Sequence, residues 1–240
     1  MRAATFNIKH GRQLQGGIDI GLLARTCVAL RTDVLALQEV DVRQIRSRFA
    51  NQAARVAAAS NMTFVFGPAY KRFGGSYGNA LLVRGEIEQQ VVLHLPQRSR
   101  EPRSCVLASV RAAGLTLSVA AGHLSTHRHE AVDQLEVIVE RLRAMPGPHL
   151  LLGDLNLEPE RVEPVIAPAG LTLVPHGPTF PNEAPRLTID HIACDGLRLQ
   201  GADTPMTPCS DHRPLVADLE PAVAIDLGAE ENSYTEPASR

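Results

Sequence analysis

The 240-residue sequence contains no tryptophan, and aromatic residues make up only 4% of it. A core without large rings must be built mainly from alanine, valine and leucine, and the hydrophobic content of 44% is sufficient for one. The sequence also carries little net charge, −2 at pH 7. This balance argues against a broad basic surface, so tight sequence-independent binding of nucleic acid is not favoured.

Cysteine is also scarce. The four cysteines are widely spaced and form no C-x-x-C pair, which predicts buried free thiols: Cys27, Cys105, Cys194 and Cys209. No apolar run approaches the roughly 18 residues that a membrane-spanning helix needs. The sequence begins directly with a strand pattern and shows no signal peptide. We therefore expect a reduced, cytoplasmic setting and a monomer.

The hydrophobic pattern predicts many strands and fewer helices. Apolar runs of strand type occur near residues 2–8, 33–39, 62–66, 78–84, 90–95, 104–111, 115–122, 148–153, 188–194 and 214–219. Helical periodicity appears at 18–31, 48–59 and 129–144. This pattern predicts an α/β fold with two packed β-sheets and helices on their outer faces. We expect one domain over residues 1–220 and a disordered acidic tail over 221–240.

Polar residues close several of the predicted strands. The apolar run at 149–152 is followed by Gly153-Asp154-Leu155-Asn156, which puts an acid and an amide two residues apart. In an extended chain such residues point the same way. Other strands end in Asn7, Glu39 and His123. Asp190 follows the short apolar run 187–189, and Ser210-Asp211-His212 precede the run that begins at Pro214. A rigid sheet presents a site in this manner.

Six short markers occur in a fixed order along the chain. They are Leu37-Gln38-Glu39-Val40-Asp41, Gly78-Asn79-Ala80-Leu81-Leu82, Gly122-His123-Leu124, Gly153-Asp154-Leu155-Asn156, Ile189-Asp190-His191-Ile192 and Ser210-Asp211-His212. This order resembles the endonuclease/exonuclease/phosphatase superfamily, and the format resembles its small bacterial members. The superfamily contains deoxyribonuclease-like nucleases, apurinic endonucleases, neutral sphingomyelinases and inositol-phosphate 5-phosphatases. The resemblance implies a four-layer sandwich of two mainly antiparallel sheets flanked by helices.

Asn7, Glu39 and Asp211 form the expected metal site. Two carboxylates and an amide carbonyl are hard oxygen ligands, which suit Mg²⁺ or Mn²⁺. The resemblance also implies roles for other residues. His123 contacts the scissile phosphate, and Asp190 orients His212 and favours its charged form. Asp154 orients the attacking water and accepts its proton, while Asn156 and Asn79 hold water or phosphate oxygens.

These expectations describe a metal-dependent hydrolase that cleaves a phosphodiester or phosphomonoester by in-line attack of an activated water. The identity of the general base stays open. Two arginine clusters suit additional phosphate groups, Arg43, Arg46 and Arg48 in one and Arg98, Arg100 and Arg103 in the other. We assign substrate binding to Asn79, Tyr77, Arg43 and Arg103. The alternatives are a repair-type DNA endonuclease or exonuclease and, less favoured, a non-catalytic binding protein.

Overall fold

The computed structural model of the chain describes residues 1–72 and 74–222. The tail expected to be disordered lies outside this part of the chain except for its first two residues, so that expectation and the domain boundary at residue 220 stay predictions. All ten predicted strands are present, together with the three predicted helices. Five further elements in the described residues were not predicted: a helix at 159–166, short 3-10 helices at 9–11 and 167–169, and strands at 172–173 and 197–203.

The first sheet has the order β11-β12-β1-β2-β4-β3. Its strands are β1 (Arg2–Asn7), β2 (Val34–Val42), β3 (Thr63–Arg72), β4 (Gly75–Val83), β11 (Leu197–Asp203) and β12 (Leu215–Pro221). Only the β1–β2 pair is parallel, and the helix α1 (Ile20–Ala29) joins those two strands. A second helix, α2 (Gln52–Ser60), lies between β2 and β3 in the chain.

The second sheet has the order β5-β6-β7-β8-β10-β9. Its strands are β5 (Gly85–His94), β6 (Ser104–Ala112), β7 (Leu115–His123), β8 (His149–Asp154), β9 (Thr172–Leu173) and β10 (Asp190–Asp195). Here β7 and β8 form the parallel pair, joined by α3 (Arg128–Arg143), and α4 (Pro159–Ile166) follows β8. The prediction of two mainly antiparallel sheets is therefore confirmed.

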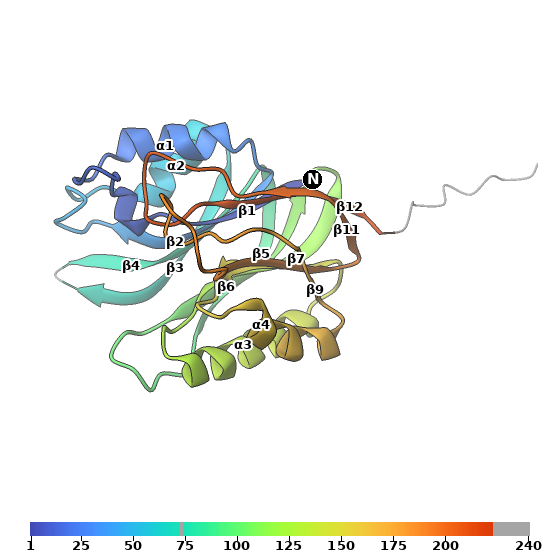
Figure 1. Cartoon of the computed structure of the whole chain (residues 1–240). Coiled ribbons are helices and arrows are strands. Elements are labelled where there is room, and N and C mark those ends of the chain that lie inside the picture. The colour runs from blue at the N-terminus through green and yellow to red at the C-terminus, as the bar shows by residue number, and fades with distance from the viewer. Residues whose placement is uncertain (73, 223–240) are drawn as a thin grey trace, which may run out of the picture.

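The four layers are visible in Figure 1, with α1 and α2 over one sheet and α3 and α4 over the other. Three hydrophobic clusters fill the spaces between them. One joins the sheets through residues such as Leu81, Val106 and Leu152. The outer clusters include Leu23 under α1 and Leu135 under α3. The four cysteines are buried and free, as predicted, and act as small apolar side chains in these layers.

Local signals explain where the predicted helices begin and end. The side chain of Asp19 accepts a hydrogen bond from the Leu22 N–H at 2.8 Å, and this caps α1. Asn51 caps α2 in the same way, and α2 ends at Asn61 in the left-handed conformation. The α3 helix buries one face, as its periodicity predicts.

The two sheets repeat one chain path, although the sequence shows no internal repeat. The succession β1-α1-β2-α2-β3-β4 matches β7-α3-β8-α4-β9-β10, and the strand neighbours match as well. Across the two sheets β1 contacts β8 and β2 contacts β7. The ends of β1 and β8 meet, since the Asn7 amide donates to Asp154. The candidate site lies where these ends meet.

Candidate functional site

Three polar side chains form a row on the second sheet. In the strand register His123 lies opposite Asp154, and Asp154 lies opposite Asp190. Opposed residues on neighbouring strands share one face of the sheet, so the three side chains are neighbours. All three are buried, with exposures of 4%, 1% and 0%. The sequence placed each of them at a strand end, and the register now shows that they meet.

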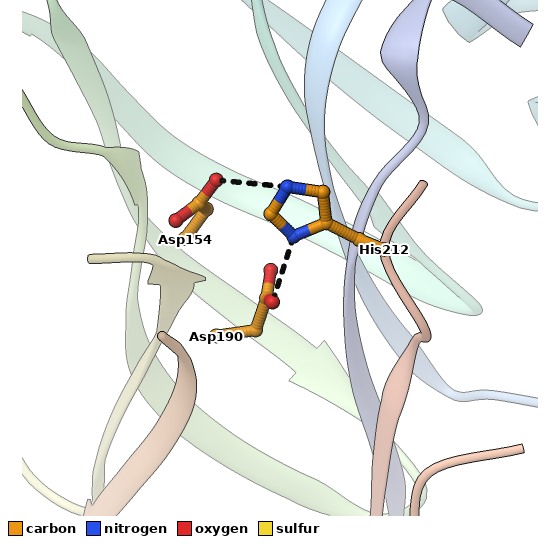
Figure 2. A group of neighbouring side chains, drawn as sticks. All are labelled: Asp154, Asp190 and His212. Carbon is orange, nitrogen blue, oxygen red and sulfur yellow. Dashed lines mark hydrogen bonds and ion pairs between the residues drawn. The ribbon is translucent and has the colours of Figure 1, made fainter. Parts of the chain in front are cut away.

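His212 approaches this row from the loop before β12. Its Nδ1 lies 2.8 Å from Asp190 Oδ2, and the Thr179 hydroxyl donates to the same oxygen at 2.5 Å. The other ring nitrogen, Nε2, lies 3.8 Å from Asp154 Oδ2. Figure 2 shows the imidazole between the two carboxylates. Asp154, Asp190 and His212 each offer a ligand atom within 4.8 Å of the others, which makes them a candidate metal-binding group.

Burial and neighbouring charge set the protonation of this group. Burial raises the pKa of Asp154 to about 7, and the nearby Asp190 charge adds to the rise. Burial alone lowers the pKa of His212, but the charge and hydrogen bond of Asp190 outweigh it and raise the pKa to about 9. At neutral pH His212 is therefore a cation beside a carboxylate that is poised between its two forms.

His123 has the opposite character. Burial lowers its pKa well below the usual value, and the positive charges of Arg103 and His212 lower it further. The Arg103 Nη1 atom lies 3.0 Å from His123 Nδ1. The site thus contains one neutral and one charged histidine. His123 Nε2 also lies 3.4 Å from Asp154 Oδ2, but burial and Arg103 favour its neutral form, whereas Asp190 favours the charged form of His212.

The first sheet contributes Asn7 and Glu39. The register of β2 against β4 shifts between Leu37 and Val40, and Glu39 in this bulge has a left-handed φ of 59°. Its side chain remains 22% exposed. The Asn7 amide donates to Glu39 Oε1 at 3.2 Å and to Asp154 Oδ2 at 2.9 Å. Asn7 therefore connects the two sheets at the site.

Two basic residues directly after β1 contact the acids of the expected metal site. The Lys9 ammonium forms an ion pair with Asp211, and the Lys9 N–H donates to Asn7 Oδ1 at 3.1 Å. The His10 Nε2 atom lies 3.3 Å from Glu39 Oε2. A basic side chain thus lies beside each expected carboxylate ligand. Burial lowers the pKa of His10, so the positive charge at neutral pH comes from Lys9.

The donor set fits a hard divalent cation. Glu39 and Asp211 offer partly exposed carboxylates, and Asn7 offers an amide carbonyl oxygen. In addition, the buried Oδ1 atom of Asp190 has no hydrogen-bond partner among the described residues. Oxygen donors that are charged and partly open to water are those that Mg²⁺ accepts, because this ion keeps several of its waters.

The residues expected to bind substrate divide into two groups. Arg103 lies beside His123 and is 5% exposed, and its buried Nε atom has no partner among the described residues. Asn79 is buried and donates to the Ser104 carbonyl at 2.7 Å. The Asn156 amide donates to the Leu124 carbonyl at 3.0 Å. Both amides are therefore held in place by the backbone.

Arg43 lies elsewhere. It is exposed and borders a cavity formed with Val42, Lys71 and Gly75, which contains none of the central residues. A different member of its cluster, Arg46, lies 5.6 Å from the centre of the Tyr77 ring. The structure therefore brings Arg46 rather than Arg43 to the side of Tyr77, and substrate binding by Arg43 stays a prediction.

Sequence reasoning missed several residues that position the site. Thr179 orients Asp190, and the Ser210 hydroxyl donates to the Asn7 carbonyl while accepting the His212 N–H. Gln52 at the start of α2 donates to the His10 carbonyl and accepts the Asp41 N–H. Only Ser210 stood in a marker of the sequence. Thr179 and Gln52 carry no local signal, because their contacts depend on the tertiary fold.

The sequence profile of the family described as the endonuclease/exonuclease/phosphatase family matches residues 4–212. A UPF0294 protein of Vibrio cholerae serotype O1 is 30% identical over 129 residues, which cover 49% of this chain and 45% of that protein. The match therefore spans less than half the length of this relative.

Solved structures share the fold across most of the chain. An endonuclease/exonuclease/phosphatase from Beutenbergia cavernae aligns over 92% of this chain and 71% of its own, with a TM-score of 0.78 and 22% identity. A mannosyl-6-phosphatase from Bacteroides thetaiotaomicron aligns over 92% and 99% of the two chains, with a TM-score of 0.73 and 15% identity. At these identities the similarity establishes the arrangement of elements.

Proposed function

Because the chain belongs to the endonuclease/exonuclease/phosphatase family, we propose that it is a magnesium-dependent phosphoesterase that cleaves its substrate by in-line attack of water. The observation that carries this proposal is the meeting of His123, Asp154 and Asp190 with His212, beside Asn7 at the end of β1 and Glu39 in the bulge of β2. Such a site unites a proton acceptor, a proton donor and a set of oxygen ligands.

Asp154 is the proposed base. A general base works best when its pKa lies near the working pH, and burial raises the pKa of Asp154 to about 7. The Asn7 amide and the Asn156 N–H each donate to one of its oxygens. These bonds hold the carboxylate in one orientation, so that it can align a water and accept its proton.

His212 is the proposed donor to the phosphoryl group. Its Nδ1 is bound to Asp190, so Nε2 is the nitrogen that can donate to a non-bridging oxygen. Charge on these oxygens must be stabilised as the phosphoester is cleaved, and a positioned cation does this in a site from which water is excluded. Asp190 keeps His212 charged, which explains why the pair is buried together.

His123 and Arg103 are the proposed phosphate contacts on the opposite side. The buried Arg103 Nε–H lacks an acceptor among the described residues, and a phosphoryl oxygen supplies one. The neutral His123 can donate a hydrogen bond without adding a second buried imidazolium beside Arg103. The proposal therefore assigns the two faces of the phosphoryl group to His212 and to the His123–Arg103 pair.

We propose Glu39, Asn7 and Asp211 as the ligands of Mg²⁺, with Mn²⁺ as a substitute. A divalent cation bound there supplies charge that neutralises phosphoryl oxygens. The alternative group of Asp154, Asp190 and His212 is less suitable, because an imidazole must be neutral to ligate a metal and Asp190 favours the charged form of His212. The ion pair of Lys9 with Asp211 supports the affinity of this carboxylate for positive charge.

The proposed substrate is a compact anionic phosphoester, either a diester or a monoester. Affinity for a DNA duplex depends on many contacts between basic side chains and phosphates. A chain with a net charge of −2 is not expected to make many of them. The fold neighbour from Bacteroides thetaiotaomicron is described as a phosphatase of a mannosyl 6-phosphate, which supports a sugar-sized substrate. We also propose a cytoplasmic monomer, supported by four buried free thiols. Among the described residues, no helix has the length and apolar character to cross a membrane.

A substrate panel tests the function. Purified protein with Mg²⁺ is offered bis-p-nitrophenyl phosphate, sugar phosphates, inositol phosphates, sphingomyelin, plasmid DNA and abasic duplex at roughly 0.15 M salt, the physiological range. We expect hydrolysis that stops in EDTA and returns with Mg²⁺ or Mn²⁺. Full activity after exhaustive chelation would contradict the metal requirement. A higher kcat/KM for duplex or abasic DNA than for all other substrates would establish the nuclease alternative, and binding without turnover the non-catalytic one.

A further inference from the structure

Two adjoining cavities lie beside the catalytic centre. The larger one has a volume of about 340 Å³ and is lined by Tyr70, Arg72, Arg100, Glu101 and Pro102. The smaller one, of about 180 Å³, shares Tyr70 and Arg72 with it. The larger volume falls within the range of small-molecule sites, about 300–1,000 Å³. Tyr70 and Arg72 thus border both cavities, which are together named the recess.

The guanidinium group of Arg103 connects the recess to His123. Glu101, which lines the larger cavity, accepts a hydrogen bond from Arg103 Nη2 at 3.1 Å. The Nη1 atom of the same guanidinium lies 3.0 Å from His123 Nδ1. On the other side, the Tyr70 ring lies 5.0 Å from the ring of Tyr77. Contacts from Glu101 through Arg103 to His123 therefore link the recess to the proposed phosphate contacts.

The charges around the larger cavity leave a positive surplus. Glu101 is balanced by its ion pair with Arg103. Arg100 is exposed and forms no hydrogen bond or ion pair within residues 1–72 and 74–222. Arg98, only two residues earlier, is instead bound to Asp133 at 2.6 Å. The same loop thus directs one arginine to a helix and leaves another beside the cavity.

We propose that the larger cavity binds a second anionic group of the substrate, a phosphate or carboxylate separated from the scissile phosphate by a spacer the size of a sugar ring, and that Arg100 recognises it. A guanidinium fork pairs with such groups through two parallel hydrogen bonds. The ring of Tyr70 is the apolar surface on which the spacer packs. This inference rests on the proposed function, because it takes the scissile phosphate to lie at His123.

Matched substrates that differ only in the second anion test the proposal. One pair is glucose 1-phosphate and glucose 1,6-bisphosphate. A second pair is the p-nitrophenyl ester of thymidine 5′-phosphate with and without a 3′-phosphate. In whichever pair the enzyme hydrolyses, we expect kcat/KM to be at least tenfold higher for the substrate that carries the second anion. Arg100→Ala should remove this preference and leave kcat/KM for the other member unchanged, whereas Arg100→Lys should retain part of it.

Arg98→Ala is the control, because it deletes the same charge from the same loop but away from the cavity. It should keep the full preference. Equal turnover of both members by an active wild-type enzyme would overturn this inference and leave the proposed function intact, whereas no turnover of any phosphoester would reject the proposed function itself. A short oligonucleotide preferred over both pairs, with the effect of Arg100→Ala confined to it, would overturn the assignment to a compact substrate.

Discussion

The two sheets follow the same chain path but end their strands differently. In the second sheet the register runs without interruption through His123, Asp154 and Asp190, and all three side chains are buried. In the first sheet the corresponding strand β2 is bulged, and Glu39 adopts a left-handed φ of 59° with its side chain partly exposed. The same arrangement of strands thus produces two kinds of strand end, buried and regularly paired in the second sheet, and bulged with a partly exposed carboxylate in the first.

This difference suits two kinds of chemistry. Burial shifts protonation equilibria, so a regular buried row is where a base and an imidazolium can be tuned. An irregular strand end turns a carboxylate toward water, where a strongly hydrated cation can reach it. Asn7 donates hydrogen bonds to Glu39 of the first sheet and Asp154 of the second, and so fixes the two carboxylates relative to each other. The comparison predicts that variants of the two edges fail in different ways.

The largest effect is expected at His212. His212→Ala should lower kcat/KM by at least about 10²-fold, the lower range for loss of a positioned charge-stabilising donor. Added metal should not restore activity, because the defect lies in the buried row. Asp190→Asn/His212→Ala should be little worse than His212→Ala alone, since Asp190 acts through the histidine.

Steady-state kinetics of Asp190→Asn, His212→Ala and the double variant decide whether the two residues act as a pair. His149→Ala is a suitable control, because His149 lies at the opposite end of β8 and binds Asp195 and the Met145 carbonyl. It should retain wild-type kcat/KM. Losses that add in the double variant would show that Asp190 and His212 work independently.

Glu39→Gln should cause the second-largest loss of activity, and added Mg²⁺ should reverse much of this loss. The variant keeps the shape of a ligand but removes its charge, so we expect roughly a tenfold higher Mg²⁺ concentration for half-activation, because ligand charge tunes the affinity of such sites. High Mg²⁺ should restore much of the turnover. Glu86→Gln, an exposed acid of β5, should give the wild-type titration curve. An unchanged curve for Glu39→Gln would remove it from the ligand set.

The pH profile of kcat/KM should have an acid limb from Asp154 and an alkaline limb from His212. Activity should rise with pH as Asp154 loses its proton, through a pKa of about 7, and fall as His212 loses its proton, through about 9. A bound cation draws both limbs to lower pH. His212→Gln keeps a donor that does not titrate, so its residual activity should lack the alkaline limb. Persistence of this limb would assign it to another group.

The smallest effect concerns stability. Because its folded-state pKa is raised from 3.8 to about 7, ionised Asp154 destabilises the fold, and this loss develops as pH rises through that interval. At pH 8 Asp154→Asn should therefore raise Tm by about 2–4 °C, which corresponds to about 1 kcal/mol in a protein of this size. The gain should disappear below pH 4, and Glu39→Gln should not show it. A lower Tm for Asp154→Asn at pH 8 would contradict this account.

The sequence predicts the strands well because their signal is local. Ten apolar runs become strands, and the face-to-face sandwich follows from them. The helix α4 escaped prediction because it contains Pro164 and buries only Val162 and Ile166. Strand β11 escaped because most of its residues are exposed, so no apolar pattern marks it.

The site is predictable where it sits on strands and less so where loops supply it. His123, Asp154 and Asp190 follow from strand ends. Strand alternation does not predict which of Arg43 and Arg46 lies beside Tyr77. Glu39 and Arg43 both have left-handed φ values, which interrupt the alternation of side-chain direction along the strand. Lys9 lies in the short 3-10 helix Lys9–Gly11 and Thr179 in an irregular segment, and no periodicity of the sequence predicts that they contact the site.

The pairing of β1 with β12 has a consequence for the order in which the chain acquires its activity. The second sheet is made from the continuous stretch 85–195, whereas the first sheet joins Arg2 to Asp218 across almost the whole chain. During synthesis from the N-terminus, the second sheet has all its strands while the first still lacks β11 and β12. Asp211 and His212 directly precede that last strand, so a nascent chain holds the proposed base long before it holds its cationic partner. We therefore expect hydrolytic activity to appear only after the residues up to the end of β12 at Pro221 have been synthesised and have paired with β1.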